Sequence, residues 1–176
     1  MRATQEKLMA MRALAFRVKR YHTFETLHTE TVGEHTARVM SLYIQFFGLP
    51  RAEVLEYILH HDLGELHAGD MPFIAKRVVP ELKEFMDLAE ERGRGLLGIP
   101  FLPDLTSVEY ARFKLCDILQ MLEFALLEIQ MGNTLAWAIK ENVMAALDKL
   151  EGLPTEQVKS GTLAILTGVP LGGEDD

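Results

Sequence analysis

The chain has 176 residues, of which 48% are apolar and 25% charged, which is the composition of a globular protein and not of a disordered one. The net charge of −8 argues against a general nucleic-acid-binding protein. The single cysteine, Cys116, excludes an intramolecular disulfide and fits a reducing compartment. No signal peptide and no membrane-spanning apolar run is visible, so we expect a soluble, cytoplasmic protein that binds neither nucleic acid nor membrane.

The first half of the chain predicts three helices. Apolar residues from Leu8 to Val18 recur at spacings of three and four, which indicates an amphipathic helix. The Thr-rich segment 22–32 has no helical period, so we expect a long loop there. A second helix begins after Thr31, which has capping-box spacing to Glu34, and ends at Gly48. The third runs over 51–61, and its expected core residues are Val54, Leu55, Ile58 and Leu59.

The second half continues the helical pattern. We expect a turn at 69–72, then helices over 80–92, 105–131, 134–150 and 154–167, with a glycine- and proline-rich loop at 93–103. No strand pattern or internal repeat is present. The sequence therefore predicts an all-α fold of about six to eight helices, in a single domain over 1–168, with a flexible tail at 169–176.

A cluster of metal-ligating side chains lies at the end of the third predicted helix. His61 and Asp62 are adjacent, and Glu65 follows at a spacing that places it on the same face of a helix. Alone, this pattern also fits an ordinary surface pair. His35, in the first turn of the second predicted helix, is a further candidate ligand.

A distant carboxylate offers a fourth ligand. Asp117 is flanked by apolar residues of the long helix, where a carboxylate is costly to bury unless it is paired or binds a cation. Lys114, three residues earlier, is an alternative partner for it. Two imidazoles and two carboxylates suit Zn²⁺, Mn²⁺, Co²⁺ or Fe²⁺ better than Ca²⁺. Open coordination positions would admit water, whose ionisation the metal favours, and a phosphate oxygen.

The order of these motifs resembles a known family. The pattern H…HD…D resembles the HD-domain metal-dependent phosphohydrolases. The surrounding residues extend the likeness to the YfbR-like 5′-deoxynucleotidases and the small phage dATP triphosphohydrolases. The resemblance covers roughly residues 8 to 150, and its motifs are Arg20-Tyr21, Thr29-Glu30-Thr31-Val32-Gly33-Glu34-His35, His60-His61-Asp62-Leu63-Gly64-Glu65, Gly69-Asp70-Met71-Pro72 and Lys114-Leu115-Cys116-Asp117.

The resemblance implies a role for each matching position. One divalent transition metal, with Zn²⁺, Co²⁺ or Mn²⁺ expected, would be held by His35, His61, Asp62 and Asp117, and a triphosphate substrate would add a Mg²⁺. Glu65 would orient the attacking water and exchange protons.

The remaining matches concern the substrate. Arg20 and Lys76 would contact phosphate, and Asp70 would lie either beside the sugar or behind the residues that contact the substrate. Tyr21 stands where the deoxynucleotidases carry a tryptophan that packs on the sugar, and Thr23 lies where the base is selected.

These observations favour a hydrolase of 2′-deoxynucleoside 5′-phosphates, which attacks the α-phosphorus and releases phosphate or triphosphate. A cyclic-nucleotide or alarmone hydrolase of the same superfamily is an alternative, although alarmone enzymes pair two acids after HD and Leu66 follows Glu65 here. A third hypothesis is a non-catalytic helical binding module. Family members are oligomeric, so we also expect a homo-oligomer of two or more copies.

Overall fold

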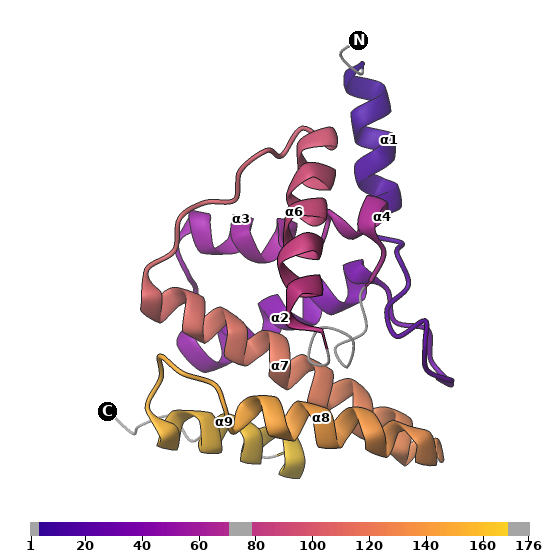
Figure 1. The fold of residues 1–176 in the computed structure, drawn as a ribbon. Helices are drawn as coiled ribbons and strands as arrows, with labels where there is room; N and C mark the ends of the chain where they lie inside the picture. The colour runs from indigo at the N-terminus through magenta and orange to yellow at the C-terminus, as the bar shows by residue number, and fades with distance from the viewer. Residues whose placement is uncertain (1–3, 71–78, 169–176) are drawn as a thin grey trace. The chain divides into compact units, whose positions relative to one another are not determined.

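The computed structural model describes residues 4–70 and 79–168. Within these ranges every regular element is a helix, and extended pairing is limited to one isolated antiparallel bridge between Lys19 and Thr31. The predicted all-α class is confirmed (Figure 1). No helix of the described ranges is long and apolar enough to cross a membrane. The predicted tail and the segment holding Lys76 and Arg77 lie outside the described residues.

The helices of the described residues are joined by connections of different lengths. In chain order they are α1 (Gln5–Ala15), α2 (Val32–Phe47), α3 (Ala52–His60), α4 (Glu65–Ala68), α6 (Pro80–Leu96), α7 (Ser107–Gln130), the 3₁₀ helix η1 (Thr134–Ala136), α8 (Trp137–Leu147) and α9 (Thr155–Thr167).

The chain divides into two compact units. The first comprises residues 1–37 and 52–104, and the second comprises residues 38–51 and 105–176, so α2 contributes to both. In the first unit α4 packs against α6 and α1, and in the second α7 packs against α8 and α9 (Figure 1). A cluster of buried apolar residues in the first unit joins the end of α1, the start of α2 and the region around α4; its members are Ala15, Val32, Leu63, Leu97 and Ile99.

The loop predicted between the first two helices is anchored at both ends. Val32 N–H donates to Val18 O and Arg20 N–H donates to Glu30 O, each at 2.9 Å. The capping box is confirmed, since Thr31 N–H donates to Glu34 Oε2 at 2.8 Å and Glu34 N–H donates to Thr31 Oγ1 at 3.2 Å. These bonds fix where α2 starts, and therefore where its first turn lies.

Three local predictions were wrong. The first helix ends at Ala15, and Leu14 is exposed, because the chain leaves the helix to pair with the segment before α2. Leu59 is also exposed. The third helix ends at His60, so a tight turn, and not a shared helix face, connects it to Glu65.

The loop predicted at 93–103 begins later than expected, because Gly93 and Gly95 lie within α6, which ends at Leu96. A Cβ on Gly64 would lie 2.2 Å from Glu90 O, and one on Gly93 would lie 2.7 Å from Gly64 O. The two backbones therefore touch without intervening side chains. Glycine serves close packing here, and the contact presses α6 against the turn before α4.

This contact generates a stability prediction with an internal control. Gly64→Ala is expected to lower the free energy of unfolding by about 1–3 kcal/mol or more, because the added methyl group meets rigid backbone. Gly95→Ala, on the same α6, meets nothing within 4 Å and should leave stability unchanged or raise it by up to about 1 kcal/mol. Thermal unfolding of both variants checks this. Equal melting temperatures would contradict the close approach.

Candidate metal centre

Three predicted ligands come together in the first unit. His35, His61 and Asp62 each offer a ligand atom, and these atoms all lie within 4.8 Å of one another. His35 is fully buried in the first turn of α2, whose start is set by the Thr31 cap. His61 and Asp62 belong to the turn between α3 and α4. Residues 26 positions apart in the chain are thus joined by the packing of α2 against this turn.

The spacing of the three atoms fits a transition metal. Asp62 Oδ2 lies 3.2 Å from His61 Nε2 and 3.6 Å from His35 Nε2. Tetrahedral zinc bonds to nitrogen and oxygen separate neighbouring ligand atoms by about 3.3–3.6 Å. The donor set and these two separations therefore fit a site for Zn²⁺ or a related ion.

The tautomer of His61 is set by the backbone. Its Nδ1 lies 2.7 Å from Ile58 O, and because a carbonyl oxygen only accepts, Nδ1 carries the proton. When the ring is neutral, the lone pair is then on Nε2, the atom that faces Asp62 and can bind a metal. Such a bond to the far ring nitrogen is typical of histidines that bind metals.

Arg20 contacts the same carboxylate oxygen. Its Nη1 donates to Asp62 Oδ2 at 2.7 Å, and its Nε lies 3.5 Å from Oε2 of the buried Glu30. Burial opposes the charge on Asp62, but His61 and Arg20 more than offset it and hold the pKa of this carboxyl well below its ordinary value. Asp62 is therefore ionised, as a metal ligand must be.

Glu65 is buried at the first position of α4. Its Oε2 has no hydrogen-bond partner among the described residues. Burial raises the pKa of Glu65 to about 9, and the charge of Asp62 acts in the same direction while Arg20 opposes it. A carboxyl group with its pKa raised in this way can hold and release a proton near neutral pH.

Several carboxyl groups of the described residues lie near Arg20. Besides Glu30, the carboxyl groups of Asp62, Glu65 and Asp70 all act on the single guanidinium of Arg20. A divalent ion bound to the three ligand atoms would add positive charge beside these carboxyl groups.

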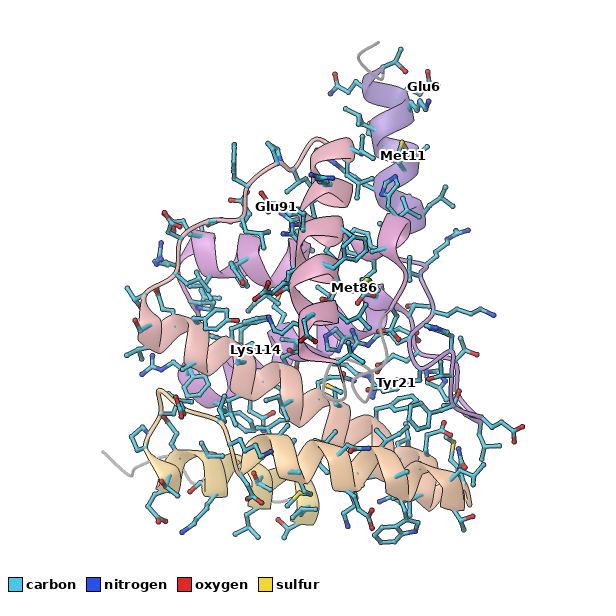
Figure 2. The ribbon with its side chains drawn as sticks, viewed as in Figure 1. Glu6, Met11, Tyr21, Met86, Glu91 and Lys114 are labelled. Atoms are coloured by element: carbon cyan, nitrogen blue, oxygen red, sulfur yellow. The ribbon has the colours of Figure 1, made fainter. Side chains whose placement is uncertain are left out.

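The predicted substrate residues Tyr21 and Asp70 lie side by side. Tyr21 N–H donates to Asp70 Oδ2 at 2.8 Å, and the guanidinium of Arg20 lies 5.7 Å from the centre of the Tyr21 ring. Figure 2 shows Tyr21 on the segment between α1 and α2. Thr23 is exposed in the turn that follows, and its role in base selection stays a prediction.

Asp117 belongs to the second unit. It lies on α7 with 8% of its surface exposed, and Lys114 donates a hydrogen bond to its Oδ2. The alternative partner that the sequence offered is therefore present, and the role of Asp117 as the fourth ligand stays a prediction. Figure 2 shows Lys114 on this helix. Lys76 lies outside the described residues, so its predicted role is also untested.

Two supporting residues were missed by the sequence reasoning. Glu30 lies in the motif over 29–35, but no local pattern in the sequence predicts that its side chain is buried beside Arg20. Arg94 lies on α6 and donates from Nη1 to His61 O at 3.1 Å, which satisfies a backbone carbonyl beyond the end of α3. Nothing in the sequence marks Arg94, because the contact spans 33 positions.

Comparison with solved structures defines the class of fold. No protein-family model matches the chain, and no curated protein matches its sequence. The fold is shared with a solved HD phosphohydrolase. A structure that shares it is the cyanophage S-2L HD phosphohydrolase DatZ, described as bound to dA and one catalytic Zn²⁺ ion; the match has 20% identity and a TM-score of 0.67, and covers 96% of this chain and 98% of that one.

Arg94 gives a prediction about the candidate metal centre. Arg94→Met removes the donor to His61 O, and loss of such a support should weaken Zn²⁺ binding by about tenfold. Arg92→Met, an exposed position on the same helix, is the control and should bind Zn²⁺ like the wild-type protein. Competition with a chromophoric zinc chelator measures both. Equal affinity of the two variants would show that Arg94 does not support the site.

Proposed function

We propose that this chain is a metal-dependent hydrolase of 2′-deoxynucleoside 5′-phosphates. The observation that carries the proposal is the convergence of His35, His61 and Asp62 at metal-ligand separations beside the buried carboxyl group of Glu65. The structural neighbour supports it, since that protein is an HD phosphohydrolase bound to a deoxynucleoside and a catalytic zinc ion.

The donor set favours Zn²⁺, with Co²⁺ and Mn²⁺ as substitutes. His35, His61 and Asp62 would hold the ion, and Asp117 is the proposed fourth ligand. A bound divalent ion lowers the pKa of water and offsets negative charge on phosphoryl oxygens. Asp62 has to remain ionised for this role, and its environment ensures that it does.

Glu65 is the proposed proton-transfer residue. Its raised pKa leaves a proton on the carboxyl group at neutral pH, so it can donate that proton to the 5′-oxygen that leaves the phosphorus. Its Oε2 is available, because no described residue hydrogen-bonds to it. In the ionised form the same group orients the attacking water.

The substrate roles follow from the arrangement around Arg20. Its guanidinium donates to Asp62 Oδ2 at 2.7 Å and is the proposed phosphate contact, together with Lys76 for a longer phosphate chain. The ring of Tyr21 is the proposed wall for the deoxyribose, with Asp70 beside the sugar and Thr23 at the base.

Monophosphates and triphosphates share the α-phosphorus as the point of attack. The released product therefore separates them: inorganic phosphate from dNMPs, and inorganic triphosphate from dNTPs. Deoxyadenosine phosphates are the first substrates to test, because the structural neighbour binds dA. Parallel assays with ribonucleotides measure the preference for the 2′-deoxy sugar, and cyclic nucleotides and alarmones test the other hydrolase activities of the superfamily.

Metal binding is the first prediction from this function. His61→Ala and Asp62→Asn should each weaken Zn²⁺ binding by more than the roughly 10–100-fold typical of a supporting residue, and should abolish phosphate release. His67→Ala, an exposed histidine on α4, is the control and should retain both. Metal analysis and product assays measure the outcome. Full activity of Asp62→Asn in metal-replete buffer would refute the mechanism.

Asp117 requires its own variant. Asp117→Ala should lower Zn²⁺ affinity if this residue completes the coordination, whereas Lys114→Met should not. Equal affinity of the two variants would assign Asp117 to the ion pair with Lys114 alone.

Proton transfer by Glu65 gives a second prediction. Glu65→Gln keeps the size of the side chain but cannot exchange a proton, so kcat should fall by about 10²–10⁴-fold while Zn²⁺ content is retained. Glu91→Gln, an exposed position on α6 seen in Figure 2, is the matched control. A binding module without catalysis would show no turnover in either variant or in the wild-type protein.

A further inference from the structure

We propose that Asp70 is a positioning residue, which accepts a hydrogen bond from Tyr21 N–H and thereby holds Arg20 and Tyr21 at the metal centre. This inference deepens the proposed function and rests on it. It differs from a direct contact between Asp70 and the substrate sugar, because Asp70 would act through the backbone of Tyr21.

Tyr21 has a φ of 56°, and it is the one non-glycine residue of the described ranges with a positive φ. The left-handed region is unfavourable for a bulky side chain because Cβ approaches the neighbouring carbonyl group. Such a conformation persists only where surrounding contacts impose it, and it occurs preferentially at functional sites. The contacts that impose it on Tyr21 can be identified.

Tyr21 is held through three of its groups. Its N–H donates to Asp70 Oδ2 at 2.8 Å, and its carbonyl oxygen accepts from Phe24 N–H at 2.8 Å. Its side chain is buried, with 9% of the residue exposed. The bond to Phe24 closes a local turn and is available in many loop conformations. The bond to Asp70 joins residues 49 positions apart, so it ties this turn to the segment that follows α4.

Asp70 reaches Tyr21 because of the residue before it. Gly69 ends α4 with a φ of 79° and a ψ of 156°, a combination open to glycine and strained for other residues. A Cβ on Gly69 would meet nothing within 4 Å, so the requirement for glycine is conformational and not steric. The short helix α4 therefore starts with Glu65, and after Gly69 the chain presents Asp70, which accepts the hydrogen bond from Tyr21 N–H.

The position of Arg20 depends on this bond. Arg20 directly precedes Tyr21, and its Nη1 lies 2.7 Å from Asp62 Oδ2. If Tyr21 relaxed to a negative φ, the chain direction on either side of it would change, and the Arg20 guanidinium and the Tyr21 ring would not keep their present positions together. Asp70 thus links the proposed proton-transfer helix to the proposed phosphate and sugar contacts.

The charge near Asp70 is consistent with an acceptor role. Its side chain is 14% exposed, and the exposed His22 places Nδ1 3.9 Å from Oδ2. That distance exceeds a hydrogen bond, so the Tyr21 amide is the closer of the two partners. An acceptor role needs an oxygen at this position but not a negative charge, and this distinction makes the proposal testable.

The first experiment measures backbone amide exchange at Tyr21 in the metal-free, full-length protein. Asp70→Ala removes the acceptor and should accelerate exchange of this amide by about tenfold or more. Asp70→Asn retains an oxygen and should keep most of the protection. Asp87→Ala, an exposed aspartate paired with Lys83, is the control and should leave Tyr21 unchanged. Unchanged exchange in Asp70→Ala, or equally fast exchange in Asp70→Asn, would overturn the proposal.

The second experiment measures kinetics and Zn²⁺ content in the same variants. Asp70→Ala should raise KM more than it lowers kcat and should keep its zinc, while Asp70→Asn should restore KM. If Asp70→Asn keeps the amide protection but has a raised KM, as Asp70→Ala does, then Asp70 acts by direct contact with the substrate and the proposal fails. If the wild-type protein hydrolyses no deoxynucleotide, the proposed function fails, and the exchange experiment alone decides whether Asp70 holds Tyr21.

Discussion

The carboxylate of Asp62 is the group on which the arrangement of the first unit depends. One oxygen, Oδ2, faces His35, His61 and Arg20 at distances of 2.7 to 3.6 Å. A charged group largely withdrawn from water needs such partners, because solvation no longer stabilises it. Each partner comes from a different part of the chain, so a single desolvated charge requires α2, the turn after α3 and the segment after α1 to meet.

Backbone contacts fix the positions of the side chains that surround this carboxylate. Gly64 and Gly93 let α6 approach the turn that carries the ligands without intervening side chains, and Arg94 satisfies a carbonyl of that turn. The hydrogen bonds between the segments before and after the long loop fix the start of α2. Ligand separations close to those of a tetrahedral metal site then follow from packing and not from the flexibility of the side chains.

Local patterns in the sequence predicted the helices well where no tertiary contact competed with the local preference of the chain. The Thr31–Glu34 capping box and the helix after Pro154 occur where they were expected. The prediction failed at Gly93, because glycine was interpreted as a loop signal when its function is close packing. It also failed where the chain leaves α1 early to pair with a segment that lies far ahead in sequence, since tertiary contacts override helical periodicity there.

The sequence by itself determined the helical class, the identity of the candidate ligands and the resemblance to the HD phosphohydrolases, because residue types, spacing and motif order are local properties. Tertiary structure alone decided that Arg20 contacts Asp62, that Glu65 lies in a site that raises its pKa, and that Tyr21 adopts a left-handed conformation and donates to Asp70. These features depend on desolvation and on contacts between residues dozens of positions apart, and local sequence patterns do not predict such contacts.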